Sequence, residues 1–321
     1  MGGYLWDKSG PPDPEVARLE QLLGQFHHSA NEPDWSAPPG FVQKYRMPLA
    51  VAAMLLVAIG VDAWLRNGWK VERLAGSPKI SGGAVAQSGL LRVGQVLETD
   101  AASRAELTVG EIGFVQVEPG TRLRLLHARD KEQRMSIERG RIVARIFAPP
   151  RRFFVNMPAA TAVDLGCAYE LEVDPNGNGR IHVTLGWVGF ESNGLESLIP
   201  AGAACVTRRV QGTGTPYFLD ASEKLIQAVE SFDTTGVGLT AILREVRPRD
   251  SLTLWHLLAR TKGPERAAVF DQFVKLVPPP PTVTREGILR LDRGMLEAWW
   301  DQLGLGATNF WKLWKSTNYM R

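Results

Sequence analysis

Apolar and polar residues follow different periods in different parts of the chain, and one part stands out. Residues 47–65 form a nearly uninterrupted apolar run whose one charged residue is Asp62. A bilayer core about 30 Å thick is spanned by about 20 helical residues, so the run predicts a single transmembrane helix. A buried helix of a soluble domain would show a polar stripe with helical period, and residues 48–61 show none.

The tail before this run, residues 1–46, contains one amphipathic pattern. Asp13, Pro14 and Glu15 are typical of a helix start, because they supply an N-cap, a first-turn proline and an early acidic residue. We therefore expect a helix from Pro14 to about Phe26. Together with Trp6, its apolar face gives a candidate partner-binding set: Trp6, Leu19, Leu22, Leu23 and Phe26.

A tail this short cannot build a large core, so its apolar face needs something to cover it. A groove in another protein would do so, with the helix laid into it. The face could equally pack on the membrane surface or on the apolar residues Tyr4, Leu5 and Trp6. The sequence leaves these alternatives open.

After the apolar run we expect a linker over residues 66–89 and then a change of period. Residues 90–220 contain short runs that alternate apolar and polar positions, such as residues 104–109, with turn residues about every ten positions. This pattern predicts an all-β domain, an antiparallel sandwich or roll. Within it, we expect Glu138 to Gly140 to turn the chain.

Residues 221–321 return to helical period and predict an α-helical C-terminal region. Pro278 to Pro281 should end one helix and act as a stiff spacer before the next. The expected helices cover residues 222–232, 251–260, 264–277 and 285–303.

One short motif is similar to a calcium-binding loop. In Asp174 to Gly179 (DPNGNG), the residues Asp174, Asn176 and Asn178 occupy alternating ligand positions, but Leu185 stands where a bidentate Glu is needed. Asn-Gly between two alternating runs is also typical of a hairpin turn. The turn is the favoured interpretation, and we predict no metal site and no cofactor.

Other chemistry is not indicated by the residues. The five histidines show no metal-ligand spacing, and no nucleophile elbow, phosphate-binding loop or zinc-protease motif is present, so we expect a protein that is not an enzyme. A net charge of +3 is small, which argues against nucleic acid as a partner.

Cys167 and Cys205 form a disulfide candidate in an oxidising compartment, and two buried reduced thiols are the alternative.

Charge near the apolar run does not settle its direction. More Lys and Arg follow it than precede it, which would place the C-terminal side in the cytoplasm, but long domains cross membranes largely regardless of charge. The relevant residues are Lys44 and Arg46 before the run and Arg66, Lys70, Arg73 and Lys79 after it.

Several segments together resemble the FecR family. They are VGQVLET from Val93, the EPGT turn at Glu118, VNMPAATAVDLGCAYELEV from Val155, and GWVGFE from Gly186. The resemblance implies a strand-rich domain that follows a single helix in the inner membrane, with the N-terminus cytoplasmic and the C-terminal domain periplasmic.

The resemblance also implies a function in signal transduction. FecR-type proteins regulate an extracytoplasmic-function sigma factor through the cytoplasmic tail, and their periplasmic part receives the signal. The tail here has no cysteine, which excludes a zinc-bound anti-sigma domain. We expect a sigma factor at the tail and an envelope protein or glycan at the β domain. The alternative is a membrane-tethered envelope scaffold with no transcriptional function.

Overall fold

The computed structural model describes residues 14–24, 51–56 and 68–305. The chain divides into two units, residues 1–62 and 63–321, which we describe separately. Of the predicted transmembrane run, residues 51–56 are helical and the others lie outside the described residues. Within the described ranges, no helix is both long and apolar enough to cross a membrane.

Residues 68–218 form an 18-stranded β region. The strands are β1 (Gly68–Ala75), β2 (Lys79–Ile80), β3 (Gly83–Ala84), β4 (Ser88–Arg92), β5 (Val96–Glu98), β6 (Arg104–Val109), β7 (Gly113–Val117), β8 (Arg122–Arg129), β9 (Glu132–Ile146), β10 (Phe153–Asn156), β11 (Thr161–Asp164), β12 (Ala168–Val173), β13 (Gly179–Leu185), β14 (Trp187–Ser192), β15 (Leu195–Pro200), β16 (Ala203–Arg208), β17 (Gly212–Thr213) and β18 (Tyr217–Phe218).

Hydrogen-bonded pairing divides these strands into two sheets that share β9. Sheet A has the order β4-β1-β6-β7-β9-β12-β13-β16, and β17 and β18 both pair with β16. Sheet B has the order β3-β2-β5-β8-β9-β10-β11-β14-β15. Every pair is antiparallel except β9 with β10, so the predicted antiparallel β fold is confirmed.

The long strand β9 passes from one sheet to the other. Residues 132–139 pair with β8 in sheet B, and residues 140–146 pair with β7 and β12 in sheet A. Gly140 lies at the change, with a φ of 101°, and a Cβ there would lie 2.3 Å from the Cα of Thr121. The predicted chain-reversing turn at Glu138 to Gly140 is therefore wrong. Glycine here permits a bend within one continuous strand.

The linker expected over residues 66–89 is also wrong, because this stretch contains most of the first four strands. In β1, Trp69 and Val71 are buried while Lys70 is exposed, the alternation of a half-buried strand. β1 lies between β4 and β6 in sheet A. The strands β2 and β3 are only two residues long, too short for an alternating pattern to appear.

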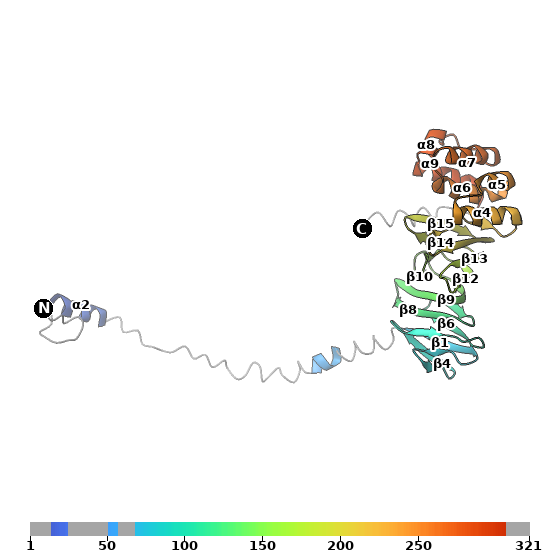
Figure 1. The fold of residues 1–321 in the computed structure, drawn as a ribbon. Helices are drawn as coiled ribbons and strands as arrows, with labels where there is room; N and C mark the ends of the chain where they lie inside the picture. Colours follow the sequence, from blue (N-terminus) through green and yellow to red (C-terminus); the bar gives the residue numbers. More distant parts are fainter. Residues whose placement is uncertain (1–13, 25–50, 57–67, 306–321) are drawn as a thin grey trace. The chain divides into compact units, whose positions relative to one another are not determined.

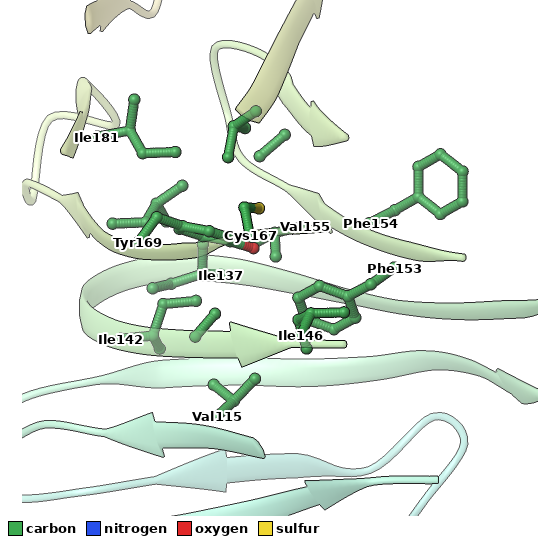
Figure 2. Close-up of a cluster of buried hydrophobic side chains, with 14 of the residues drawn as sticks. Val115, Ile137, Ile142, Ile146, Phe153, Phe154, Val155, Cys167, Tyr169 and Ile181 are labelled. Carbon is green, nitrogen blue, oxygen red and sulfur yellow. The ribbon is translucent and has the colours of Figure 1, made fainter. Parts of the chain in front are cut away.

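The inward side chains of both sheets form one apolar core. Figure 2 shows part of it, where Ile137 and Ile142 of β9 and Val155 of β10 lie around Cys167 and Tyr169. The segments on the two sides of Gly140 thus contribute to the same core. Burial of such side chains from water is the main source of stability of this region.

The helices are α2 (Pro14–Leu23), α4 (Glu223–Thr235), α5 (Leu239–Glu245), η2 (Pro248–Asp250), α6 (Ser251–Arg260), α7 (Gly263–Leu276), α8 (Arg285–Leu289), α9 (Arg293–Trp300) and η3 (Asp301–Leu303). The expected helices at α4, α6 and α7 are confirmed. The single helix expected over residues 285–303 is instead three short ones, with Leu291 at a φ of 61° in the first break. The sequence prediction missed α5.

Helices α4 to α9 gather at the end of the β region formed by its last strands (Figure 1). They have a second apolar core, in which the ring of Trp299 stacks on that of Phe273 with 4.1 Å between centroids. The indole of Trp299 also donates to the carbonyl of Val277, at the end of α7. The proline segment ends α7 as predicted, and the chain then folds back so that α9 packs on α7.

Candidate functional site

The tail helix α2 contains the part of the predicted partner-binding face that the structure describes. Pro14 begins the helix, and Glu15 in its first turn favours the positive end of the helix dipole. Leu19, Leu22 and Leu23 have the spacing i, i+3, i+4, which places them on one side. Trp6 and Phe26, the other two members of the predicted set, lie outside the described residues.

The leucine face of α2, defined as Leu19, Leu22 and Leu23, is open to solvent. These side chains are 57%, 52% and 64% exposed, and no residue of α2 is buried. Adjacent exposed leucines on a helix are typical of a surface that binds a protein groove or a membrane. The structure describes three of the five residues of this predicted site, and partner binding by them stays a prediction.

A second apolar surface lies on the outside of sheet A. Phe114 of β7 is paired with Arg145 of β9, Arg145 with Ala168 of β12, and Ala168 with Leu185 of β13. Paired residues of neighbouring strands share a face, so these four form one row. Phe114 and Leu185 are exposed, as is Phe147, two residues beyond Arg145. We call the three exposed apolar side chains Phe114, Phe147 and Leu185 the outer apolar row. The sequence analysis did not predict it.

The last strands and the helices are joined by a polar cluster that the sequence analysis also missed. The guanidinium of Arg260 on α6 donates to the hydroxyl of Ser197 at 2.6 Å and to the carbonyl of Gly214 at 2.8 Å. Asp233 of α4 accepts from the amide of Thr215 at 2.6 Å and from its hydroxyl at 2.7 Å. Burial raises the pKa of the Asp233 carboxyl, while the Thr215 bonds and the charge of Arg260 oppose that rise.

His256 of α6 belongs to the same junction and has a structural role. Its Nε2 accepts from the backbone amide of Leu198 at 2.9 Å, and its Nδ1 lies 2.8 Å from the carbonyl of Leu252. One ring nitrogen accepts and the other donates, which is the pattern of a neutral imidazole. The bond also covers the outer backbone of β15, an edge strand of sheet B. The cluster therefore fastens α4 and α6 to the sheets.

A pocket of about 480 Å³ lies near the end of the described C-terminal residues. Its walls include Trp187, Pro200 and Phe218, and Arg249 is the charged residue that lines it. The Arg249 guanidinium lies 4.7 Å above the Phe218 ring, and its Nε is 3.4 Å from a carboxylate oxygen of Asp220. Arg249 is thus held by contacts within the protein, and we assign no ligand to this pocket.

The disulfide predicted between Cys167 and Cys205 is not formed, and both residues are buried free thiols. Cys205 on β16 is paired with Ile181 on β13, and Ile181 with Leu171 on β12, four residues beyond Cys167. At about 4.8 Å per strand and about 3.3 Å per residue, the two cysteines are separated by more than the roughly 6 Å that a disulfide spans. The alternative of two reduced thiols agrees with the structure.

The DPNGNG segment is the turn of the hairpin between β12 and β13, as favoured from the sequence. The Asp174 carboxylate accepts from the amides of Asn176 and Asn178 at 2.8 Å and 2.9 Å and from the Asn178 side chain at 2.9 Å. These bonds lower the pKa of Asp174. The oxygens that would bind calcium therefore serve the turn. In the described ranges, no three His, Cys, Asp or Glu side chains are grouped to hold a metal ion.

Comparison with known proteins gives little. No family model matches the chain, and no curated protein matches it. Two crystal structures, each of "a putative anti-sigma factor" from Parabacteroides distasonis ATCC 8503, are 13% identical to it with a TM-score of 0.34. The likeness covers 41% of this chain and 63% and 62% of those chains. At that TM-score, it carries no information about what this protein does.

Proposed function

We propose that this protein is a single-pass membrane regulator of the kind that its resemblance to the FecR family implies. In this proposal the tail binds a cytoplasmic sigma factor through α2, residues 47–65 cross the inner membrane, and the β region receives a signal in the periplasm by binding another protein or a glycan. The protein acts by binding and catalyses no reaction. The observation that carries the proposal is the exposed leucine face of α2.

The length of α2 strengthens this argument. The helix has ten residues, and isolated helices shorter than about 12–15 residues are only marginally stable in water. Among the described residues, no side chain of α2 is buried. A partner with an apolar groove would stabilise the helix and bury the three leucines at once, which couples folding of the tail to binding.

The outer apolar row supports the second half of the proposal. Phe114 and Leu185, together with Phe147 just after β9, are exposed on a sheet whose other face contributes to the apolar core. Exposed aromatic and aliphatic side chains that lie together on a rigid sheet are typical of a docking surface. Arg145, in the middle of the row, gives the surface a charged centre that selects among apolar partners.

The binding test uses the full-length protein in detergent with extracytoplasmic-function sigma factors encoded by the same genome. We expect one of them to bind, and we expect Leu19→Asp combined with Leu22→Asp to weaken binding by at least tenfold. Burial of one leucine contributes about 1.5–3 kcal/mol, and about 1.4 kcal/mol corresponds to tenfold in affinity.

The matched control is Ala17→Asp combined with Gln21→Asp, which adds the same two negative charges on the opposite side of α2. It should change the affinity by less than about twofold, since about 0.4 kcal/mol would account for that change. If no sigma factor binds the wild-type protein, or if the leucine variant binds as well as the control, the proposal is wrong. A periplasm-dependent reporter fused after Arg321 tests the topology separately, and an inactive fusion would contradict it.

A further inference from the structure

The chain crosses from sheet B to sheet A in the three residues between β11 and β12. Asp164 ends β11, and Ala168 begins β12. We call residues 164–167 the crossover. Two hydrogen bonds to the Asp164 side chain span it: one oxygen accepts from the amide of Gly166 at 2.7 Å and the other from the thiol of Cys167 at 2.6 Å. These bonds lower the pKa of Asp164 by less than burial raises it.

Asp164 lies in the apolar core with almost no contact with solvent. Its side chain faces inward, and the residue is 1% exposed. Its register partner is Val188 on β14, and Val188 is paired with Ile199 on β15. A carboxylate in such surroundings loses the hydration of its charge, which disfavours the ionised form.

No cation compensates this charge within the described part of the chain. The backbone amide of Arg151 donates to the Asp164 carbonyl at 3.0 Å. Its guanidinium instead bonds Glu191 at 3.0 Å. Cys167, from the crossover, is the titratable side chain that bonds Asp164. Burial and then the charge of Asp164 raise the pKa of Tyr169, from β12. Near Asp164, Val188 of β14 and Ile199 of β15 contribute apolar side chains, and β15 also carries the buried Ser197 and the half-buried Glu196.

Tyr169 adds an independent observation. Its hydroxyl is buried and has no hydrogen-bond partner among the described residues. Figure 2 shows Tyr169 and Cys167 next to each other among aliphatic side chains. The core therefore contains a carboxyl, a thiol and an unpaired hydroxyl in one small region, although most buried polar groups in proteins are paired.

We propose that the crossover responds to protons: it is closed when Asp164 is protonated, and it opens more readily when Asp164 is ionised. Burial raises the pKa of Asp164 from 3.8 to about 7. A group whose pKa is raised by folding contributes stability that is complete below its unfolded pKa and is lost as the pH rises to its folded pKa. The loss therefore falls between about pH 4 and pH 7, with a plateau above that window.

The crossover also contacts the part of the β region next to the helices. The amide of Leu165 donates to the carbonyl of Trp187 at 3.2 Å, and the Trp187 ring lies 5.8 Å from that of Trp300 on α9. An open crossover loses the first of these contacts. Protonation of the Asp164 carboxyl would therefore change the contacts of Trp187, which packs against α9 at the end of the β region.

The test compares alkylation rates of the two buried thiols in the full-length protein. Cys167 lies in the crossover, whereas Cys205 on β16 lies outside it and serves as an internal reference for the chemistry of the thiolate. The measured quantity is the rate at Cys167 divided by that at Cys205. We expect the ratio to rise by up to about tenfold per pH unit between about pH 5 and pH 6.5, and to level off above about pH 7.

Two variants sharpen the test. Asp164→Asn keeps the shape of the carboxyl without its charge, so the ratio should become independent of pH. Glu170→Gln removes a carboxylate from an outward position on β12, the strand that follows the crossover, and should leave the rise unchanged. A constant ratio in the wild-type protein overturns the proposal even if Asp164→Asn does not fold. An equal rise in Asp164→Asn would overturn it too.

Discussion

Helices α2 and α6 are both ten residues long and both have leucines on one side, yet they have opposite surroundings. In α6, the side chains of Leu254, Leu257 and Leu258 are completely buried against neighbouring helices and strands. In α2, all three leucines are exposed. The pattern of apolar residues is therefore the same kind of signal in both helices. They differ in that the described residues bury the leucines of α6 and leave those of α2 exposed.

This difference separates two uses of an amphipathic helix. The leucines of α6 contribute to the folding of the protein, because their burial accompanies formation of the tertiary structure. Those of α2 can contribute only when something else covers them. A mutation in one helix should thus change stability, and the equivalent mutation in the other should change binding.

The largest expected effect is that of Leu257→Ala in α6. The substitution removes a completely buried side chain and leaves a cavity, so it should lower the free energy of unfolding by about 2–5 kcal/mol. Urea unfolding monitored by circular dichroism measures this loss. A loss below about 1 kcal/mol would mean that α6 is not packed as described, since core truncations rarely cost so little.

A smaller effect is expected at the start of α4, where Ser222 accepts from the amide of Leu225 at 3.1 Å. Ser222→Ala removes this N-cap and should cost about 1 kcal/mol, whereas Ser222→Gly should cost only a few tenths. The same unfolding experiment measures both. If Ser222→Ala costs as much as Leu257→Ala, then local capping, and not packing, dominates the stability of this region.

The smallest effect on stability is expected for Leu22→Ala in α2. An exposed side chain makes few contacts, so the free energy of unfolding should change by less than about 0.5 kcal/mol. Affinity for the cytoplasmic partner should fall instead. A large loss of stability would show that α2 is packed on another part of this chain, and the comparison between the two helices would no longer hold.

Much of the fold can be predicted from short-range periodicity. The run at residues 104–109 is β6, and the apolar face at residues 251–260 is α6, because both are long enough for their period to appear. The linker predicted for residues 66–89 failed in two ways: the alternation of the eight-residue strand β1 was overlooked, and β2 and β3 have only two residues each. Their conformation comes from pairing with distant strands, and such pairing leaves no local pattern.

The candidate sites divide in the same way. The leucine face of α2 follows from spacing alone, so the sequence reveals it. Two other features could not be predicted: the bond between Arg260 and Ser197, and the inward carboxyl of Asp164. Both depend on which segments meet in space. The disulfide prediction failed for the same reason, since the strand β13 separates the two cysteines.

The single strand β9 has a consequence for how this protein folds. Its two halves pair with β8 and β10 on one side of Gly140 and with β7 and β12 on the other. Because β9 belongs to both sheets, unfolding of this strand disrupts both of them. We therefore expect the two sheets to unfold in one cooperative transition. The residues that pair between β9 and β12 are farther apart in the sequence than those that pair between β8 and β9. Pairings between residues that are distant in the sequence are slow to form. We therefore expect the β8–β9 hairpin to form before β9 pairs with β12.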